Sequence, residues 1–212
     1  MKFHFEPNLD YQADAIRAVC DLFRGQEICR SVFTVTREAG PRKSEQLELP
    51  GFEKSKQLSL PGLDSELGIG NRLQLLPDEL LRNLEEIQLR NGLKPSTSLE
   101  SHDFTVEMET GTGKTYVYLR TIFELNQRFG FTKFVIVVPS VAIKEGVYKT
   151  LQMTEEHFRS NYANVPFQYF LYDSNKLGQV RAFATSPNIQ IMVVTVGAIN
   201  KKDVNNLYKE SE

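Results

Sequence analysis

The chain lacks the features that would assign it to several specialised classes of protein. Its longest apolar stretches, residues 134–138 and 189–194, are far too short to span a membrane. The first ten residues, MKFHFEPNLD, have no apolar run like that of a signal peptide. The only two cysteines, Cys20 and Cys29, fit neither a zinc-ligand spacing nor a disulfide framework. A reduced, cytoplasmic protein with no membrane partner is therefore expected.

A strong charge of either sign is also missing. Lysine and arginine number 25 and aspartate and glutamate 27, which gives a net charge of −2. No global positive field draws such a chain to nucleic acid, so any DNA contact requires a local patch. The three histidines, His4, His102 and His157, are scattered, and we assign them no metal role. With 41% hydrophobic residues the chain can bury a core.

Composition and periodicity divide the chain into four segments. Residues 1–38 form an N-terminal segment, with a predicted helix over 8–24 and a predicted strand over 28–36. Residues 39–71 are rich in Gly, Pro, Ser and charge, which indicates a flexible loop or insertion. Residues 72–200 are expected to form an incomplete nucleotide-binding domain, and residues 201–212 a polar tail.

Strands and helices are predicted to alternate in the third segment. The helix over 77–90 has proline at its first position and leucines on one side. The apolar run at 133–138 predicts a strand buried on both faces. Further strands are predicted at 104–108, 167–172 and 189–195, and further helices at 114–128 and 141–158. This alternation predicts an α/β fold with a doubly wound, mainly parallel sheet.

A glycine-rich turn between the strand at 104–108 and the following helix is suited to phosphate. Its sequence is Thr110-Gly111-Thr112-Gly113-Lys114-Thr115. The glycines allow a tight turn, and backbone N–H groups and the helix N-terminus would then surround phosphate oxygens. The lysine would reach the β- and γ-phosphates, and the threonine would be a Mg²⁺ ligand. The turn therefore predicts ATP and Mg²⁺ as cofactors.

The turn departs from the general pattern G-x-x-x-x-G-K-[ST] at one position. Where the pattern has its first glycine, this chain has Met108. A chance Gly/Thr/Lys turn is the alternative interpretation, but six matching residues between a strand and a helix favour a nucleotide site.

This turn resembles motif I of superfamily 2 helicases and translocases, and other stretches agree with that resemblance. LDYQADAI (9–16) resembles the upstream Q motif, and VVPS (137–140) with AIKEG (142–146) resembles motif Ia. VVTVG (193–197) stands where a later motif contacts the nucleic-acid backbone. The longer strings PNLDYQADAI, METGTGKTYVYLRTIFEL and FVIVVPSVAIKEGV are most similar to the restriction (Res) subunit of type III restriction–modification enzymes.

The resemblance implies a RecA-like motor domain and a role for individual residues. Gln12 would hydrogen-bond the adenine, since a side-chain amide offers both a donor and an acceptor. Pro139, Ser140, Lys144 and Thr195 would lie along a DNA backbone, which suits a motor that ignores sequence. In the whole family protein, ATP use moves the complex along double-stranded DNA and cleavage follows. A methyltransferase (Mod) partner subunit selects the site.

The resemblance also implies catalytic parts that these 212 residues do not contain. An acidic pair should follow motif Ia, its Asp acting on Mg²⁺ and its Glu on the attacking water. The only Asp-Glu pair, Asp78-Glu79, precedes the phosphate loop. No second motor domain or nuclease domain is recognisable. We therefore assign no catalytic residue, and we expect an N-terminal fragment that binds ATP but hydrolyses it negligibly alone.

Two alternatives remain open at the level of sequence. The chain can belong to another DNA or RNA helicase-like protein of superfamily 2, which a downstream nuclease domain would argue against. It can also be a binding module, because QLELPG (46–51) and QLSLPG (57–62) form an internal echo. Residues 57–61 resemble the short motif with which bacterial proteins dock on the replication sliding clamp.

Overall fold

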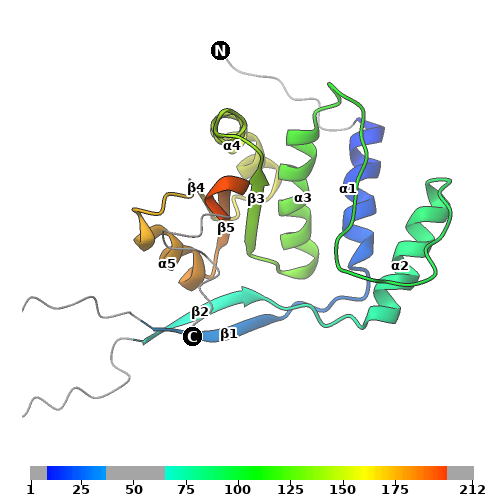
Figure 1. Cartoon of the computed structure of the whole chain (residues 1–212), viewed down its shortest axis with the longest axis horizontal. Coiled ribbons are helices and arrows are strands. Elements are labelled where there is room, and N and C mark those ends of the chain that lie inside the picture. The colour runs from blue at the N-terminus through cyan, green and yellow to red at the C-terminus, as the bar shows by residue number, and fades with distance from the viewer. Residues whose placement is uncertain (1–8, 37–64, 200–212) are drawn as a thin grey trace, which may run out of the picture.

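A computed structural model describes residues 9–36 and 65–199 of the chain (Figure 1). The predicted polar tail at 201–212 and the QL-x-L-P segments lie outside the described residues. The elements in chain order are α1 (Asp10–Leu22), β1 (Arg30–Thr36), β2 (Ser65–Asn71), α2 (Pro77–Arg90), α3 (Lys114–Phe129), β3 (Lys133–Val138), α4 (Val141–Asn161), β4 (Phe167–Leu171), α5 (Leu177–Thr185), β5 (Ile189–Thr195) and α6 (Val196–Ile199).

A parallel sheet of order β3-β5-β4 forms the centre of the domain. Strand β5 lies between the other two, and its residues from Ile189 to Val194 are all buried. Helices α3 and α4 pack on one face of the sheet, and α5 and α6 pack on the other. The predicted α/β class with a doubly wound parallel sheet is therefore confirmed, and it agrees with a RecA-like motor domain.

Stacked aromatic rings fill the core between α3, α4 and the sheet. The ring centroids of Phe123 on α3 and Phe158 on α4 are 4.7 Å apart, and both side chains are almost fully buried. Tyr116 stacks on Phe158 at 5.7 Å, and Phe167 of β4 meets Phe123 edge-on at 5.0 Å. Such contacts join the phosphate-loop helix to both α4 and the sheet, so this core fixes the direction in which α3 begins.

Helices α1, α2 and α3 lie side by side, with α1 between the other two (Figure 1). Ile16 and Cys20 of α1 are buried against Val117 and Leu125 of α3. The side-chain amide of Asn83 on α2 donates to the backbone carbonyls of Leu22 and Arg24 at the end of α1. These two hydrogen bonds are largely buried, so they fix α2 against α1 more firmly than the exposed ion pair Arg24–Glu86 does.

Strand β2 corrects the prediction of a loop over residues 39–71. Residues 65–71 pair antiparallel with β1. Two glycines, which suggest a loop in sequence, instead leave room for an aromatic ring on the partner strand. A Cβ atom at Gly68 would lie 2.3 Å from the ring of Phe33, and Gly70 lies beside the same ring. The strand forms because β1 supplies both the hydrogen bonds and the ring, and neither is visible in the local composition.

Two other predictions about strands are wrong in part. Residues 104–108 belong to no strand of the described structure, because no neighbouring strand pairs with them. Strand β3 forms as predicted but is not buried on both faces. Val135 and Val137 are 48% and 49% exposed, whereas their partners in β5, Met192 and Val194, are buried under α5 and α6. These two helices cover β4 and β5 and leave the outer face of β3 open.

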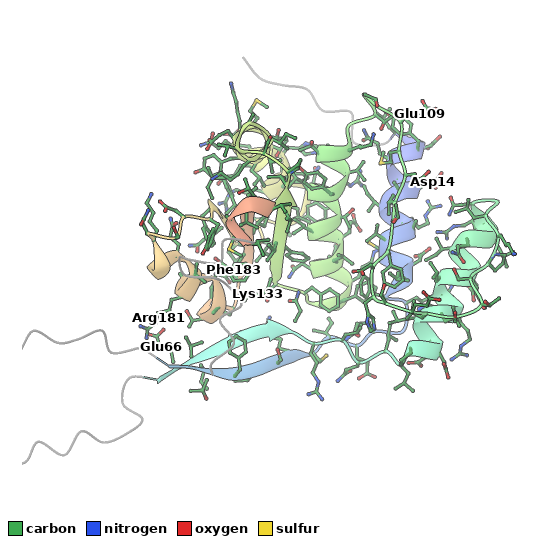
Figure 2. The ribbon with its side chains drawn as sticks, viewed as in Figure 1. Asp14, Glu66, Glu109, Lys133, Arg181 and Phe183 are labelled. Atoms are coloured by element: carbon green, nitrogen blue, oxygen red, sulfur yellow. The ribbon has the colours of Figure 1, made fainter. Side chains whose placement is uncertain are left out.

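The Lys133 side chain joins β3 to the end of α5. Its ammonium group donates to the Ser186 carbonyl and lies 5.7 Å from the centre of the Phe183 ring, and Figure 2 shows Lys133 and Phe183 together. Burial lowers the pKa of Lys133 from 10.5 to about 8, with a smaller contribution from the charge of Arg30.

This pKa shift predicts a pH-dependent contribution to stability. Between about pH 8 and pH 10.5 the folded chain holds fewer protons at Lys133 than the unfolded chain does. The contribution of Lys133 to the free energy of unfolding therefore rises with pH across that interval. Urea unfolding at pH 7.5, 9 and 10.5 should show a gap between the parent and Lys133→Met that changes with pH. An exposed control, Lys94→Met, should follow the parent at a constant offset. Parallel curves for parent and Lys133→Met would contradict the assignment.

The two cysteines occupy different environments. Cys20 is completely buried in α1, and burial raises the pKa of its thiol to about 11. Cys29 is partly exposed before β1, and its thiol donates to the Arg72 carbonyl at 3.2 Å. No helix within residues 9–36 and 65–199 is long and apolar enough to cross a bilayer.

Candidate nucleotide and DNA sites

The phosphate loop turns sharply because two glycines adopt a backbone conformation that other residues rarely adopt. Gly111 has φ +85° and Gly113 has φ +82°. Gly113 is the N-cap of α3, and the first backbone bond of that helix runs from the Val117 N–H to the Gly113 carbonyl. The N–H groups before Val117 therefore have no partner within the helix and lie at its positive end.

The side chains of the loop fold back onto its own backbone. The Glu109 carbonyl accepts a hydrogen bond from the Lys114 ammonium at 2.7 Å and another from the Thr112 hydroxyl at 2.7 Å. The lysine is exposed and makes no ion pair within the described part of the chain. Its charge is therefore held by a neutral carbonyl, which an anion can replace.

Two residues attach the loop to its surroundings, Gln12 from α1 and Met108 from the start of the loop itself. Gln12 is buried, and its amide donates to the Thr112 carbonyl at 2.8 Å. Met108 packs against the cluster formed by α1 and α3. The methionine that departs from the sequence pattern thus attaches the start of the loop to the core. The structure brings Gln12 to the loop, as its place in a Q motif implies, while its contact with adenine remains a prediction.

These features fit a bound nucleotide. A Cβ atom built on Gly111 meets nothing within 4 Å, so the loop is open at that point. The N–H groups at the start of α3 and the exposed Lys114 follow directly in the chain, and they are donors of the kind that phosphate oxygens require. The Thr115 hydroxyl, one position after the lysine, also has the hard oxygen that Mg²⁺ prefers.

The predicted DNA-contacting residues gather at the carboxyl edge of the parallel sheet. Ser140 caps α4, and its hydroxyl accepts a hydrogen bond from the Ile143 N–H at 3.3 Å. Thr195 ends β5 opposite Val138, directly beside Pro139. Lys144 lies one turn into α4. The structure therefore brings Pro139, Ser140, Lys144 and Thr195 to one edge, and Figure 1 shows this edge at the same end of the molecule as the start of α3.

The sequence prediction missed a second group of residues at this edge. The loop after β4 holds Ser174 and Lys176, and together with Lys144 these residues line a cavity. A strand end followed by polar residues in an α/β fold was the available signal, because ligands bind outside the carboxyl ends of parallel strands.

The Asp78-Glu79 pair has a structural role. The Glu79 carboxylate accepts a hydrogen bond from the Leu76 N–H at 2.9 Å, which caps the start of α2. Neither residue belongs to the phosphate loop or to the carboxyl edge of the sheet.

Comparison with known proteins gives one consistent result. The family model described as "Type III restriction enzyme, res subunit" matches residues 7–212. The EcoPI Res subunit of Escherichia phage P1 is 32% identical over an alignment of 159 residues that covers 66% of this chain. The EcoP15I Res subunit of Escherichia coli is 33% identical over an alignment of 155 residues that covers 64% of this chain. The StyLTI Res subunit of Salmonella typhimurium is 54% identical over 61 residues, which is 28% of this chain and 6% of that protein. The aligned part covers only 16% of each of the first two relatives.

Proposed function

The chain belongs to the family of type III restriction enzyme Res subunits, and from this premise we propose that it is an ATP-binding motor part of such an enzyme. The family is one of restriction enzymes, and the relatives are Res subunits of type III restriction–modification enzymes. The proposed role is to couple ATP use to movement along double-stranded DNA, which leads to cleavage by the whole protein.

The observation that carries the proposal is the conformation of the phosphate loop. Two glycines with positive φ lead into a 16-residue helix whose first N–H groups lack helical partners. A lysine at the first helical position is held by a carbonyl and has no carboxylate partner in the described residues. This combination binds phosphate and has no evident structural purpose without it.

Each residue of the loop has a role in the proposed complex. Lys114 would exchange the Glu109 carbonyl for the β- and γ-phosphates, which is a gain because a charge-assisted bond replaces a neutral one. Thr115 would be a ligand of Mg²⁺, which neutralises phosphate charge when bound. Gln12 would keep its hydrogen bond to the Thr112 carbonyl and would contact the adenine with its side-chain carbonyl oxygen and its second amide N–H.

We propose that ATP hydrolysis requires catalytic residues that these 212 residues do not supply. The 212 residues contain no Asp-Glu pair after the phosphate loop, so nothing recognisable positions the attacking water. We therefore expect this polypeptide to bind ATP and to turn it over negligibly by itself. Site selection on DNA would belong to a methyltransferase (Mod) partner, because backbone contacts alone carry no sequence information.

A titration with a fluorescent ATP analogue and Mg²⁺ tests the proposal. Lys114→Ala removes the charge on the β- and γ-phosphates, and the binding free energy should fall by about 1.5–3 kcal/mol. Lys94→Ala, an exposed lysine in the loop after α2, is the matched control and should bind as the parent does. Equal binding by parent and Lys114→Ala, or no saturable binding by the parent, would overturn the nucleotide site.

A further inference from the structure

Strands β1 and β2 form a two-stranded ribbon, and one edge of it pairs with no strand in the part of the chain that the structure describes. Strand β2 makes most of the ribbon's contacts with α5, including the ion pair between Glu66 and Arg181 that Figure 2 shows. The Asn71 side chain of β2 bonds to the backbone of Thr132 and Lys133 at the start of β3. Figure 1 shows β1 on the side of the ribbon away from these elements, so the open edge belongs to β1.

The sequence of β1 does not protect this edge. Edge strands commonly avoid pairing with other chains by means of charged residues, prolines or bulges. The one charge of β1 is at its first residue, Arg30, and residues 31–36 are SVFTVT. The register with β2 runs without a bulge from Arg30 to Thr36. Because Val32 and Thr34 are also exposed, this edge is a template on which another strand can add.

The geometry of the edge selects an extended chain as its partner. Alternate residues of β1 direct their backbone N–H and C=O groups away from β2, and only another strand matches such a row of donors and acceptors. The large side chain of Phe33 does not obstruct that approach. Its ring lies over Gly68 and Gly70 of β2, where an added Cβ atom would meet it at 2.3 and 3.4 Å.

The distribution of charge favours a second copy of this chain as the source of that strand. An antiparallel pair centred on Phe33 aligns all seven residues of both strands and places Val32 opposite Thr34 of the second copy. The two Arg30 side chains then lie at opposite ends of the pair, about 20 Å apart, and do not repel each other. The pairing uses the same edge of both copies, so association stops at two.

We propose that β1 pairs antiparallel with β1 of a second copy, so that two ribbons form one four-stranded sheet of order β2-β1-β1-β2. The interface is independent of the proposed function, because it contains no residue of the phosphate loop or of the carboxyl edge of the parallel sheet. With seven residues of β1 on each side, it is small beside the roughly 20–30 residues a side of a stable complex. Dimerisation is therefore expected to be reversible and to depend on protein concentration.

Sedimentation equilibrium of the 212-residue chain at several concentrations tests the proposal, and the parent should show monomer and dimer in equilibrium. Val32→Lys and Thr34→Glu each place two like charges diagonally across the pair, about 7–8 Å apart, and each should weaken dimerisation about tenfold. Both positions are exposed, so the substitutions are compatible with the fold. An equimolar mixture of the two variants should regain association, because the substituted positions then face each other with opposite charges.

Leu67→Lys is the matched control, and it separates pairing through the edge from contact through the apolar face. Leu67 is 68% exposed and lies opposite Thr34 within the ribbon, so it shares a face with Val32 but stands away from the open edge. This variant should dimerise as the parent does. A parent that stays monomeric at every concentration would overturn the proposal. So would an effect of Leu67→Lys as large as that of Val32→Lys, or a mixture of variants that does not regain association.

Discussion

Phe158→Ala is expected to lower the free energy of unfolding by about 3–5 kcal/mol. Phe158 is completely buried, and its ring contacts Phe123 and Tyr116 of α3. Its removal leaves a cavity where α3, α4 and the sheet meet, and the stacked partners cannot all move to fill it. Urea denaturation followed by circular dichroism measures the loss, which should also lower Tm by about 10 °C.

Phe158→Leu is the matched control for this prediction. It keeps most of the volume and should cost only about 1–1.5 kcal/mol. If alanine costs no more than leucine, the aromatic stack does not hold α3 against α4 as the structure indicates. Met153→Ala, at a position 40% exposed on the same helix, should have a smaller effect than either.

Gly113→Ala is expected to weaken binding of the ATP analogue by about 30-fold or more. The left-handed conformation at φ +82° costs an alanine about 1–2 kcal/mol. The new Cβ atom would also lie 2.7 Å from the Gln12 amide nitrogen, which is closer than real contacts allow. Gln12 must then move and give up its bond to the Thr112 carbonyl, which adds about 0.5–1.5 kcal/mol.

Two controls separate these causes. Gly111→Ala has a similar φ but open space, so it should show the conformational cost without the contact with Gln12. Gly146→Ala lies in helix α4 with nothing within 4 Å, and it should leave nucleotide binding unchanged. In a Gln12→Ala background the Gly113→Ala change should cost less than in the parent. An equal loss of binding free energy in both backgrounds would show that contact between Gln12 and the new Cβ atom does not contribute to the effect.

The sequence predicted elements well where local periodicity decides the structure. The leucines of α2 specify a helix, with Leu80 buried, and the apolar run of β5 specifies a buried strand. Predictions failed where a distant partner decides. Residues 104–108 have a strand pattern but pair with no strand in the described structure, whereas the glycine-containing β2 forms because Phe33 lies across it. Val135 in β3 is exposed because the covering helices stop at β5.

The candidate site was predictable in its parts but not in its connections. The loop sequence indicated the turn at Gly113 and the position of Lys114 at the start of a helix, and the structure has both. A one-dimensional pattern does not show that Gln12 holds the loop across a separation of 100 residues. Nor does it show that Lys176 lies with Lys144 in one cavity, because that depends on the order of strands in the sheet.

The unequal burial of the two thiols gives the chain a natural position for a reporter dye. A maleimide reacts with thiolate, so the enclosed Cys20, whose pKa is raised to about 11, stays unreacted while the protein is folded. Cys29 alone would carry the label, at the start of the β1–β2 ribbon. A second equivalent of dye would be taken up only as α1 separates from α3, so the stoichiometry of labelling would itself report global unfolding without any engineered residue.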